Sequence, residues 1–258
     1  MFDFLKKKEE IIEDIEIVYE EDYTDVEPIS RYFHNETGIT FDSQISILKS
    51  KLTSFCKQRN IYSFTKLLED IKTNSSLKQE LIDYLTTNET FFYREFKQIS
   101  ELVELVKKTN GKVNILCAPS ATGEEPYSIA IALLEAGVPG SNFELVGIDI
   151  NSEAILKAEQ AVYGERNVRN ISAEVLSKYF LKNNDKYSLN QNVKSLVSFR
   201  LANLFDTTFT SLGKFDFVFS RNMLIYFDKE TKLKAKSILE SMRKNDNCEV
   251  FFGHADLF

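Results

Sequence analysis

Apolar side chains recur every three or four positions along the first third of the chain, a spacing that places them on one face of a helix. The recurrence covers residues 29–84, and no strand-like alternation interrupts it. The pattern therefore predicts a small all-helical domain. The residues that recur at this spacing are Ile45, Leu48, Leu52, Phe55, Phe64, Leu67, Leu68, Ile71, Leu77, Leu81, Ile82 and Leu85.

After residue 95, short apolar runs alternate with amphipathic stretches, and residues 179–202 hold further short strand signals. Helices are expected to begin at the Gly123 turn, at Ser152, which is the expected N-cap, and at Asp228. Strands that alternate with helices predict an α/β domain with a mostly parallel sheet over residues 96–258. The clearest expected strands are 113–118, 143–148, 215–219 and 248–252.

The net charge of -7 is concentrated at the N-terminus. Residues 1–27 hold 11 acidic and 3 basic side chains, which leaves 28 acidic and 29 basic side chains for the rest of the chain. Residues 1–28 are therefore an acidic extension, either a solvated segment or a docked amphipathic helix. The near-neutral body lacks the basic surface that nucleic acids require, so no nucleic-acid partner is expected. The apolar residues at helical spacing in the extension are Ile11, Ile12, Ile15, Val18 and Tyr19.

The cysteines and histidines suggest neither disulfides nor metal chemistry. Cys56, Cys117 and Cys248 are odd in number and widely spaced, as expected of reduced thiols in the cytoplasm. No apolar run reaches transmembrane length, so direct membrane insertion is not expected. His34 and His254 lie far apart without neighbouring ligand residues, so we expect no metal and no histidine-dependent hydrolase.

Basic residues cluster on the second expected helix, where Lys49, Lys51, Lys57 and Arg59 lie close together in the sequence. Two interpretations stay open. The cluster is a solvated helix face, or it contacts an acidic partner.

In a parallel sheet, ligands bind beyond the carboxyl ends of the strands, where the strand order reverses. The chain places polar residues at each of these ends: the loop from Ala118 to Glu125, Asp149, the pair Asn203-Leu204, and the pair Arg221-Asn222. Asp149 closes the second strand and is placed to accept the two hydroxyls of a ribose. These residues form the candidate ligand site.

The loop after the first strand limits which nucleotide can bind. Its single glycine, Gly123, does not form a dinucleotide fingerprint, and no phosphate-binding Gly-Lys-Ser/Thr sequence occurs. Glu124 and Glu125 would repel phosphate but suit the ammonium and sulfonium groups of S-adenosylmethionine. One of the two glutamates is expected only to complement the helix dipole.

Two longer strings carry a specific resemblance: Thr122-Gly-Glu-Glu-Pro-Tyr-Ser128 and Ser220-Arg-Asn-Met-Leu-Ile-Tyr-Phe-Asp228. With Leu85-Thr-Thr-Asn-Glu-Thr90, Gly147-Ile-Asp149 and Ala202-Asn203-Leu204, in this order, they resemble the CheR-type chemotaxis receptor methyltransferases. The resemblance covers nearly all of the chain after residue 29. It implies a Rossmann-like class I methyltransferase domain with a small antiparallel β subdomain at about 179–200, preceded by the helical domain.

The resemblance also assigns roles by position. It implies an S-adenosylmethionine site to which the linker, residues 85–95, contributes. Arg94 and Tyr226 would lie nearest the transferred methyl, and Arg94 would also touch the cofactor. The other implied cofactor contacts are Asn88, Thr90, Ala118, Glu125, Asp149, Asn203, Leu204, Arg221 and Asn222.

The implied substrate is a glutamate side chain on the cytoplasmic domain of a membrane chemotaxis receptor, methylated for sensory adaptation. The helical domain would then recognise the acidic receptor helices through Lys49, Lys51, Lys57 and Arg59, and the enzyme would be recruited from the cytoplasm to receptor arrays. The short, glycine-free turn at 183–187 argues against binding of a receptor's C-terminal peptide tether. Members usually continue beyond Phe258 into one more strand, so an incomplete sheet edge or a shortened chain is expected. Two rivals stay open: a non-catalytic binding module, and a methyltransferase of this fold that acts on another substrate.

Overall fold

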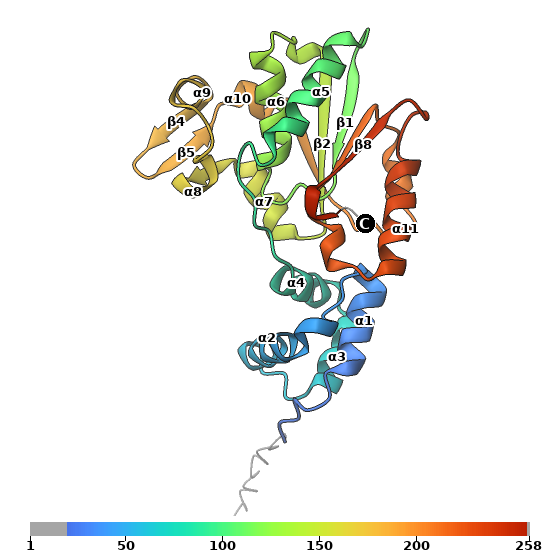
Figure 1. Ribbon diagram of the computed structural model, residues 1–258. Helices are drawn as coiled ribbons and strands as arrows, with labels where there is room; N and C mark the ends of the chain where they lie inside the picture. Colours follow the sequence, from blue (N-terminus) through green and yellow to red (C-terminus); the bar gives the residue numbers. More distant parts are fainter. Residues whose placement is uncertain (1–19, 257–258) are drawn as a thin grey trace, which may run out of the picture.

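The computed structural model describes residues 20–256, so the apolar positions predicted at 11–19 lie outside the described part. Four helices of the N-terminal part pack around a core of their own, which contains Phe33, Leu52 and Phe55 (Figure 1). Ser63 and Asn74 cap two of these helices with their side chains. The helices are α1 (Glu27–Thr37), α2 (Ile45–Gln58), α3 (Phe64–Thr73) and α4 (Ser75–Leu85), with the 3₁₀ turn η1 (Asp42–Gln44) before α2.

The C-terminal part is built on a five-stranded sheet in the order β6-β2-β1-β7-β8, and every pairing in it is parallel. The order reverses between β1 and β7, so a crevice for a ligand is expected at the carboxyl ends of these two strands. The fold class predicted from the sequence is confirmed. The strands are β1 (Val113–Cys117), β2 (Phe143–Asp149), β6 (Val197–Leu201), β7 (Phe217–Ser220) and β8 (Glu249–Phe252).

Alternation along the strands sends side chains to opposite faces of the sheet. Ile115 and Cys117 pack in the core that α5 (Phe96–Lys108) and α6 (Glu124–Glu135) cover. Leu116 packs on the other face, with Leu239 and Met242 from α11 (Lys229–Ser241) and the residue that follows it. Helices therefore cover both faces, and α7 (Ser152–Gln160) packs on β2 and β6.

A small antiparallel sheet with the order β3-β5-β4 lies beside the large one. The prediction put this subdomain at about 179–200, but the structure differs at both ends. Val162–Gly164 pairs with β5, and Val197–Leu201 pairs with β2 in the large sheet. These pairings join segments far apart in the sequence, which local strand signals do not specify. The remaining elements are β3 (Val162–Gly164), β4 (Phe180–Asn183), β5 (Lys186–Leu189), the short helices α8 (Glu165–Val168), α9 (Ala173–Tyr179) and α10 (Gln191–Lys194), and the 3₁₀ turns η2 (Gly140–Asn142), η3 (Phe209–Leu212), η4 (Leu224–Tyr226) and η5 (His254–Asp256).

The helical part docks against the carboxyl edge of the large sheet through polar contacts. The Asp83 carboxylate on α4 accepts hydrogen bonds from the backbone N–H (2.7 Å) and hydroxyl of Ser152. Asn151 donates to the Asp83 carbonyl, and its side-chain oxygen caps α7 by accepting from the Ala154 N–H at 2.8 Å. The cap is thus Asn151 and not the predicted Ser152, whose hydroxyl is engaged by α4. Within residues 20–256, no helix is long and apolar enough to cross a membrane.

Candidate cofactor and methyl-transfer site

Asp149 lies at the carboxyl end of β2 and is 5% exposed. Its Oδ2 accepts from the Ala121 N–H at 2.8 Å, and its Oδ1 accepts from the Asn151 N–H at 2.9 Å. Burial raises the pKa of Asp149 to about 6, although these hydrogen bonds oppose the increase. Each carboxylate oxygen keeps a further lone pair, so the group can accept two hydroxyls, as the ribose prediction requires.

Glu124 and Glu125 begin α6, but their surroundings differ. The Glu124 carboxylate accepts from the Thr122 hydroxyl at 2.6 Å and from the Asn167 side chain at 2.7 Å, which joins α6 to the start of α8. Glu125 Oε2 accepts from Arg221, whereas Glu125 Oε1 is buried without a partner among the described residues. Glu125 is therefore the glutamate with a free acceptor, in agreement with the position that the resemblance implies.

Arg221 follows β7, and its side chain is 2% exposed. The guanidinium donates to Glu125 Oε2 and to the Arg94 carbonyl at 2.9 Å, with longer contacts of 3.4 Å to the Glu95 carbonyl and Gln98 Oε1. We call this set of contacts the Arg221 clamp. It ties the linker to α6 at the sheet edge. The Arg221 side chain thus contacts other protein groups, and the sequence did not predict these contacts.

Asp256, which was not among the predicted site residues, lies on η5 after β8 and is 1% exposed. Its Oδ2 accepts from the backbone N–H groups of Asn222 and, at 3.2 Å, of Gly253. Burial raises the pKa of Asp256. The carboxylate therefore orients the backbone of Asn222, a predicted cofactor residue with a φ of 59°. No motif around Asp256 in the sequence predicts that this acid is buried or that it contacts the candidate site.

The linker around Arg94 is a turn that includes two left-handed residues. Tyr93 and Glu95 have φ values of 59° and 50°, a conformation that non-glycine residues adopt only where surrounding contacts enforce it. Arg94 Nη1 donates to the Glu89 carbonyl at 3.2 Å, and its charge acts on the Glu125 carboxyl group. The linker residues Asn88 and Thr90 are half-buried.

Asn203 and Leu204 follow β6, and Asn203 contacts the helical domain. Asn203 donates to the Glu36 carbonyl of α1 at 2.6 Å and accepts from the Phe205 N–H at 3.0 Å. Leu204 is buried in the core on the α11 face of the sheet, together with Ala118. Asn203 thus couples this edge of the candidate site to the helical domain.

Tyr226 ends η4 and is 40% exposed. Its carbonyl accepts from the Thr40 N–H at 3.0 Å, and its neighbour Phe227 forms a β-bridge with Ile39. The loop between α1 and η1 therefore fixes the backbone of Tyr226 while leaving the ring accessible. This suits contact with a substrate that touches both parts of the chain.

Four buried side-chain atoms lack a hydrogen-bond partner within residues 20–256: Ser120 Oγ, Glu125 Oε1, Ser220 Oγ and Asp256 Oδ1. Each follows or ends a strand of the large sheet or begins α6, so all four lie toward the carboxyl edge of the sheet. Buried polar atoms are normally paired, and such a group of exceptions indicates a polar ligand. Glu125 Oε1 suits an ammonium and Asp149 suits a ribose, so the edge fits S-adenosylmethionine.

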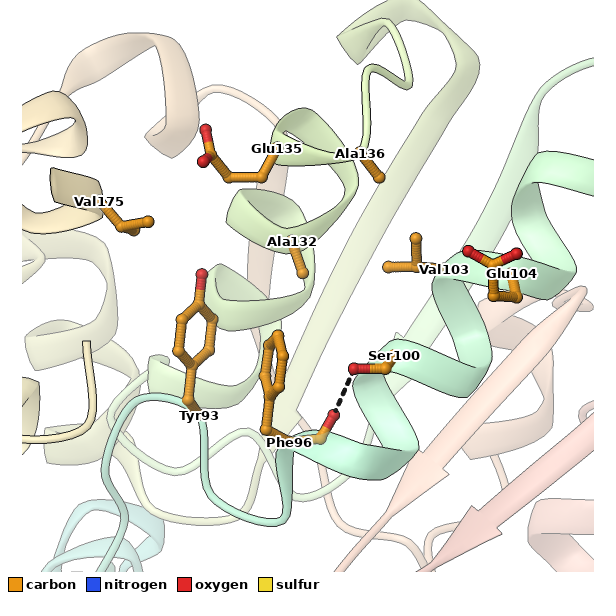
Figure 2. A pocket seen from close by; sticks show the side chains of 9 residues that line it. All are labelled: Tyr93, Phe96, Ser100, Val103, Glu104, Ala132, Glu135, Ala136 and Val175. Atoms are coloured by element: carbon orange, nitrogen blue, oxygen red, sulfur yellow. Dashed lines mark hydrogen bonds between the residues drawn. The ribbon is translucent and has the colours of Figure 1, made fainter. Parts of the chain in front are cut away.

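A separate surface groove lies away from this edge. It has a volume of about 400 Å³ and lies between α5, α6 and α9, with Tyr93 and Phe96 side by side at one end (Figure 2). Their ring centroids are 4.4 Å apart. None of the predicted site residues lines this groove, which is mainly apolar.

The predicted basic residues of the helical domain fall into two groups. Lys57 pairs with Glu21 at 3.1 Å, and Arg59 pairs with Glu80 at 2.9 Å while stacking on the Phe55 ring. Lys49 and Lys51 form no ion pair with any residue in the described range. Arg59 therefore has a structural role in addition to any role in substrate binding.

The strand order, the carboxylate that ends β2 and the unpaired carboxylate oxygen on α6 fit an S-adenosylmethionine-dependent methyltransferase. Residues 88–258 match the family model of the CheR methyltransferase, SAM binding domain, and the chain belongs to this family.

Relatives extend the match into the helical domain. A chemotaxis protein methyltransferase of Campylobacter jejuni is 38% identical over 86% of this chain and 84% of its own length. Chemotaxis protein methyltransferase 2 of Vibrio cholerae is 31% identical, over 87% of this chain and 82% of its own length. Among solved structures, a SAM-dependent methyltransferase from Geobacter sulfurreducens aligns with 60% of this chain and 47% of its own at 11% identity and a TM-score of 0.35, too low to support an argument.

Proposed function

We propose that the chain transfers the methyl group of S-adenosylmethionine to glutamate side chains in the cytoplasmic domains of chemotaxis receptors. The observation that carries the proposal is the pair of carboxylates at the sheet edge, Asp149 and Glu125, within a chain of this family. The printed names of the relatives support chemotaxis as the process. The receptor as substrate places the enzyme in the cytoplasm, beside receptor arrays.

In this proposal the chain holds the cofactor at both of its polar ends. Asp149 accepts the ribose hydroxyls, Glu125 Oε1 accepts the ammonium, and Asn88, Thr90, Asn203, Leu204 and Asn222 complete the site. S-adenosylmethionine supplies a methyl group on positively charged sulfur. The Arg221 clamp joins Glu125 to the linker and so fixes the distance between them.

The reaction at the acceptor carboxylate requires few catalytic groups from the protein. A glutamate carboxylate is ionised at neutral pH, so no general base is required. Rate enhancement then comes mainly from placing the carboxylate oxygen in line with the methyl carbon and sulfur and from excluding water. Arg94 orients the incoming carboxylate by charge, and the accessible hydroxyl of Tyr226 positions it by a hydrogen bond. Lys49 and Lys51 attract the acidic receptor helix to α2.

The test is methyl transfer from labelled S-adenosylmethionine to membranes of a chemotactic bacterium that lacks its own methyltransferase. Methyl esters of glutamate release labelled methanol in base. We expect base-labile label on the receptor band, and a loss of at least 100-fold in rate for Arg94→Ala, the order of effect of a lost positioning group. Lys112→Ala is the control, because Lys112 precedes β1 at the opposite end of the sheet and pairs there with Glu144.

The outcomes separate the candidates. Base-stable label, or label on small molecules only, would contradict the receptor-glutamate proposal. Full methylation by Arg94→Ala would remove Arg94 from the mechanism. Binding of S-adenosylhomocysteine without any transfer would support the rival of a non-catalytic binding module.

A further inference from the structure

Two arginines lie against the same aromatic ring of the linker. The Arg169 guanidinium carbon is 3.7 Å from the centre of the Phe91 ring, a distance at which it lies over the face of the ring. The Arg94 guanidinium carbon is 5.8 Å from the same centre. The two carbons can be no further apart than these two distances together, which is less than the ~11 Å of two helical turns. Phe91 thus brings two positive charges together beside the candidate site.

The backbones that carry the two arginines are joined to one another. Arg169 directly follows α8, and α8 is held to the linker because the Phe92 N–H donates to the Asn167 carbonyl at 2.9 Å. The Asn167 side chain also donates to Glu124 at the start of α6. The Phe92 ring packs edge-on against Tyr163 of β3, with the ring centroids 4.8 Å apart. The linker and α8 therefore present their arginines from one connected framework.

Both guanidinium groups keep unused donors. Arg169 Nη1 donates to the Arg166 carbonyl, and Arg94 Nη1 donates to the Glu89 carbonyl at 3.2 Å. Within residues 20–256, neither arginine pairs with a carboxylate. Stacking occupies the face of a guanidinium group and leaves the N–H groups at its edge free, in the geometry that receives a carboxylate through two hydrogen bonds. Arg169 is also exposed, so an acidic group of another molecule can reach it.

We propose that Arg169 is a substrate-binding residue, which binds a second carboxylate on the acidic helix whose target glutamate Arg94 orients. The inference rests on the proposed function, because it takes Arg94 as the group that faces the acceptor. Side chains three or four residues apart lie about 5–6 Å apart on one face of a helix, which fits two guanidinium groups less than two turns apart. The enzyme therefore prefers glutamates that have a second acid three or four residues away, and Phe91 holds Arg169 in position for it.

The preference is tested with receptor variants that keep a single methylatable glutamate. The first has an acid four residues from it, the second has glutamine there, and the third has its acid two residues away, on another face of the helix. We expect the KM for the first to be about fivefold lower than for the other two, the upper range for an exposed ion pair.

The enzyme variants locate the preference. Arg169→Gln should abolish it at unchanged kcat, and Phe91→Leu should weaken it, because the guanidinium loses its stacking surface. Lys108→Gln is the charge-matched control and should keep the preference, because this exposed lysine ends α5 on the side away from the linker. A preference that is unchanged in Arg169→Gln would overturn the inference.

A charge exchange tests direct contact. A receptor variant with lysine four residues from the target should be a poor substrate for the unmodified enzyme, and Arg169→Glu should restore its methylation. An indirect, structural role of Arg169 predicts no such rescue, so its absence would overturn the inference.

A binding measurement separates the inference from the proposed function. The full chain, loaded with S-adenosylhomocysteine, is sedimented with membranes that contain each receptor variant. Should no enzyme variant methylate any receptor, the proposed function fails, whereas a binding preference that Arg169→Gln abolishes would still support the second carboxylate site. Equal sedimentation with all receptor variants would overturn it.

Discussion

Replacing Arg221 by methionine tests whether the Arg221 clamp holds the candidate site together. The substitution keeps an unbranched apolar stem but removes the guanidinium, and with it every donor. It leaves the Glu125 carboxylate buried with neither oxygen paired, since Oε1 already lacks a partner among the described residues. The Arg94 carbonyl loses its 2.9 Å hydrogen bond as well.

The expected cost follows from the burial of both partners. Their side chains are 2% and 11% exposed, so solvent screens the pair little. Removing one member of a buried ion pair costs about 3–5 kcal/mol, because the other charge remains desolvated. Arg221→Met/Glu125→Leu should cost much less, about 1 kcal/mol or below, because no unpaired charge remains. The two single costs will therefore not add.

The assay is urea unfolding followed by far-UV circular dichroism, since the chain has no tryptophan to report on folding. Arg31→Met is the matched control: its ion pair with Glu27 has both side chains more than 60% exposed, and its loss should cost less than about 0.5 kcal/mol. A cost below about 1 kcal/mol for Arg221→Met, or additive single and double variants, would refute the reasoning.

Three further predictions concern the sheet edge. The pKa of Asp149 is about 6 and the ribose needs the ionised form, so the affinity for S-adenosylhomocysteine should fall about tenfold from pH 7 to pH 5. The variant Asp149→Asn should bind S-adenosylhomocysteine weakly at every pH. Titration calorimetry measures both affinities. Asp256→Ala frees the backbone of Asn222, so we expect weaker S-adenosylhomocysteine binding at unchanged helix content; unchanged affinity would contradict this role. In Gly253→Ala the new Cβ would lie 2.9 Å from Asp256 Oδ2 and 3.0 Å from the Asn222 nitrogen, and calorimetry should show a Tm several degrees lower.

The raised pKa of Asp149 also affects the stability of the fold. Burial raises the pKa of Asp149 above the value of an unfolded chain, so the protonated form is favoured in the fold. Its contribution to the free energy of unfolding is fully present below the unfolded pKa of 3.8 and is lost as the pH rises through about 6. Cofactor binding acts in the opposite direction, because it uses the charged form.

The sequence predicted the sheet and the edge where its polar residues meet, since apolar runs and turn residues are local signals. It could not show where long side chains point. Arg221 reaches carbonyls in the linker 127 residues away, and Asn203 reaches a carbonyl of α1 that is 167 residues away. The capping of α7 was missed for the same reason: Asn151 and Ser152 are both good caps, and Asp83 on α4 decides between them by engaging the Ser152 hydroxyl.

These long-range contacts explain why a reaction without a general base uses a chain of two parts. In-line transfer depends on the separation of donor and acceptor, so the elements that hold each must be fixed to one another. Arg221 fixes the linker to α6, Asn203 and Asn151 fix the sheet edge to α1 and α4, and the Thr40 N–H fixes the backbone of Tyr226. Under the proposed function, a receptor helix bound on the helical part would thereby be held at a set distance from the carboxyl edge. The helical part would then set the distance between the acceptor and the carboxyl edge of the sheet, in addition to providing a binding surface.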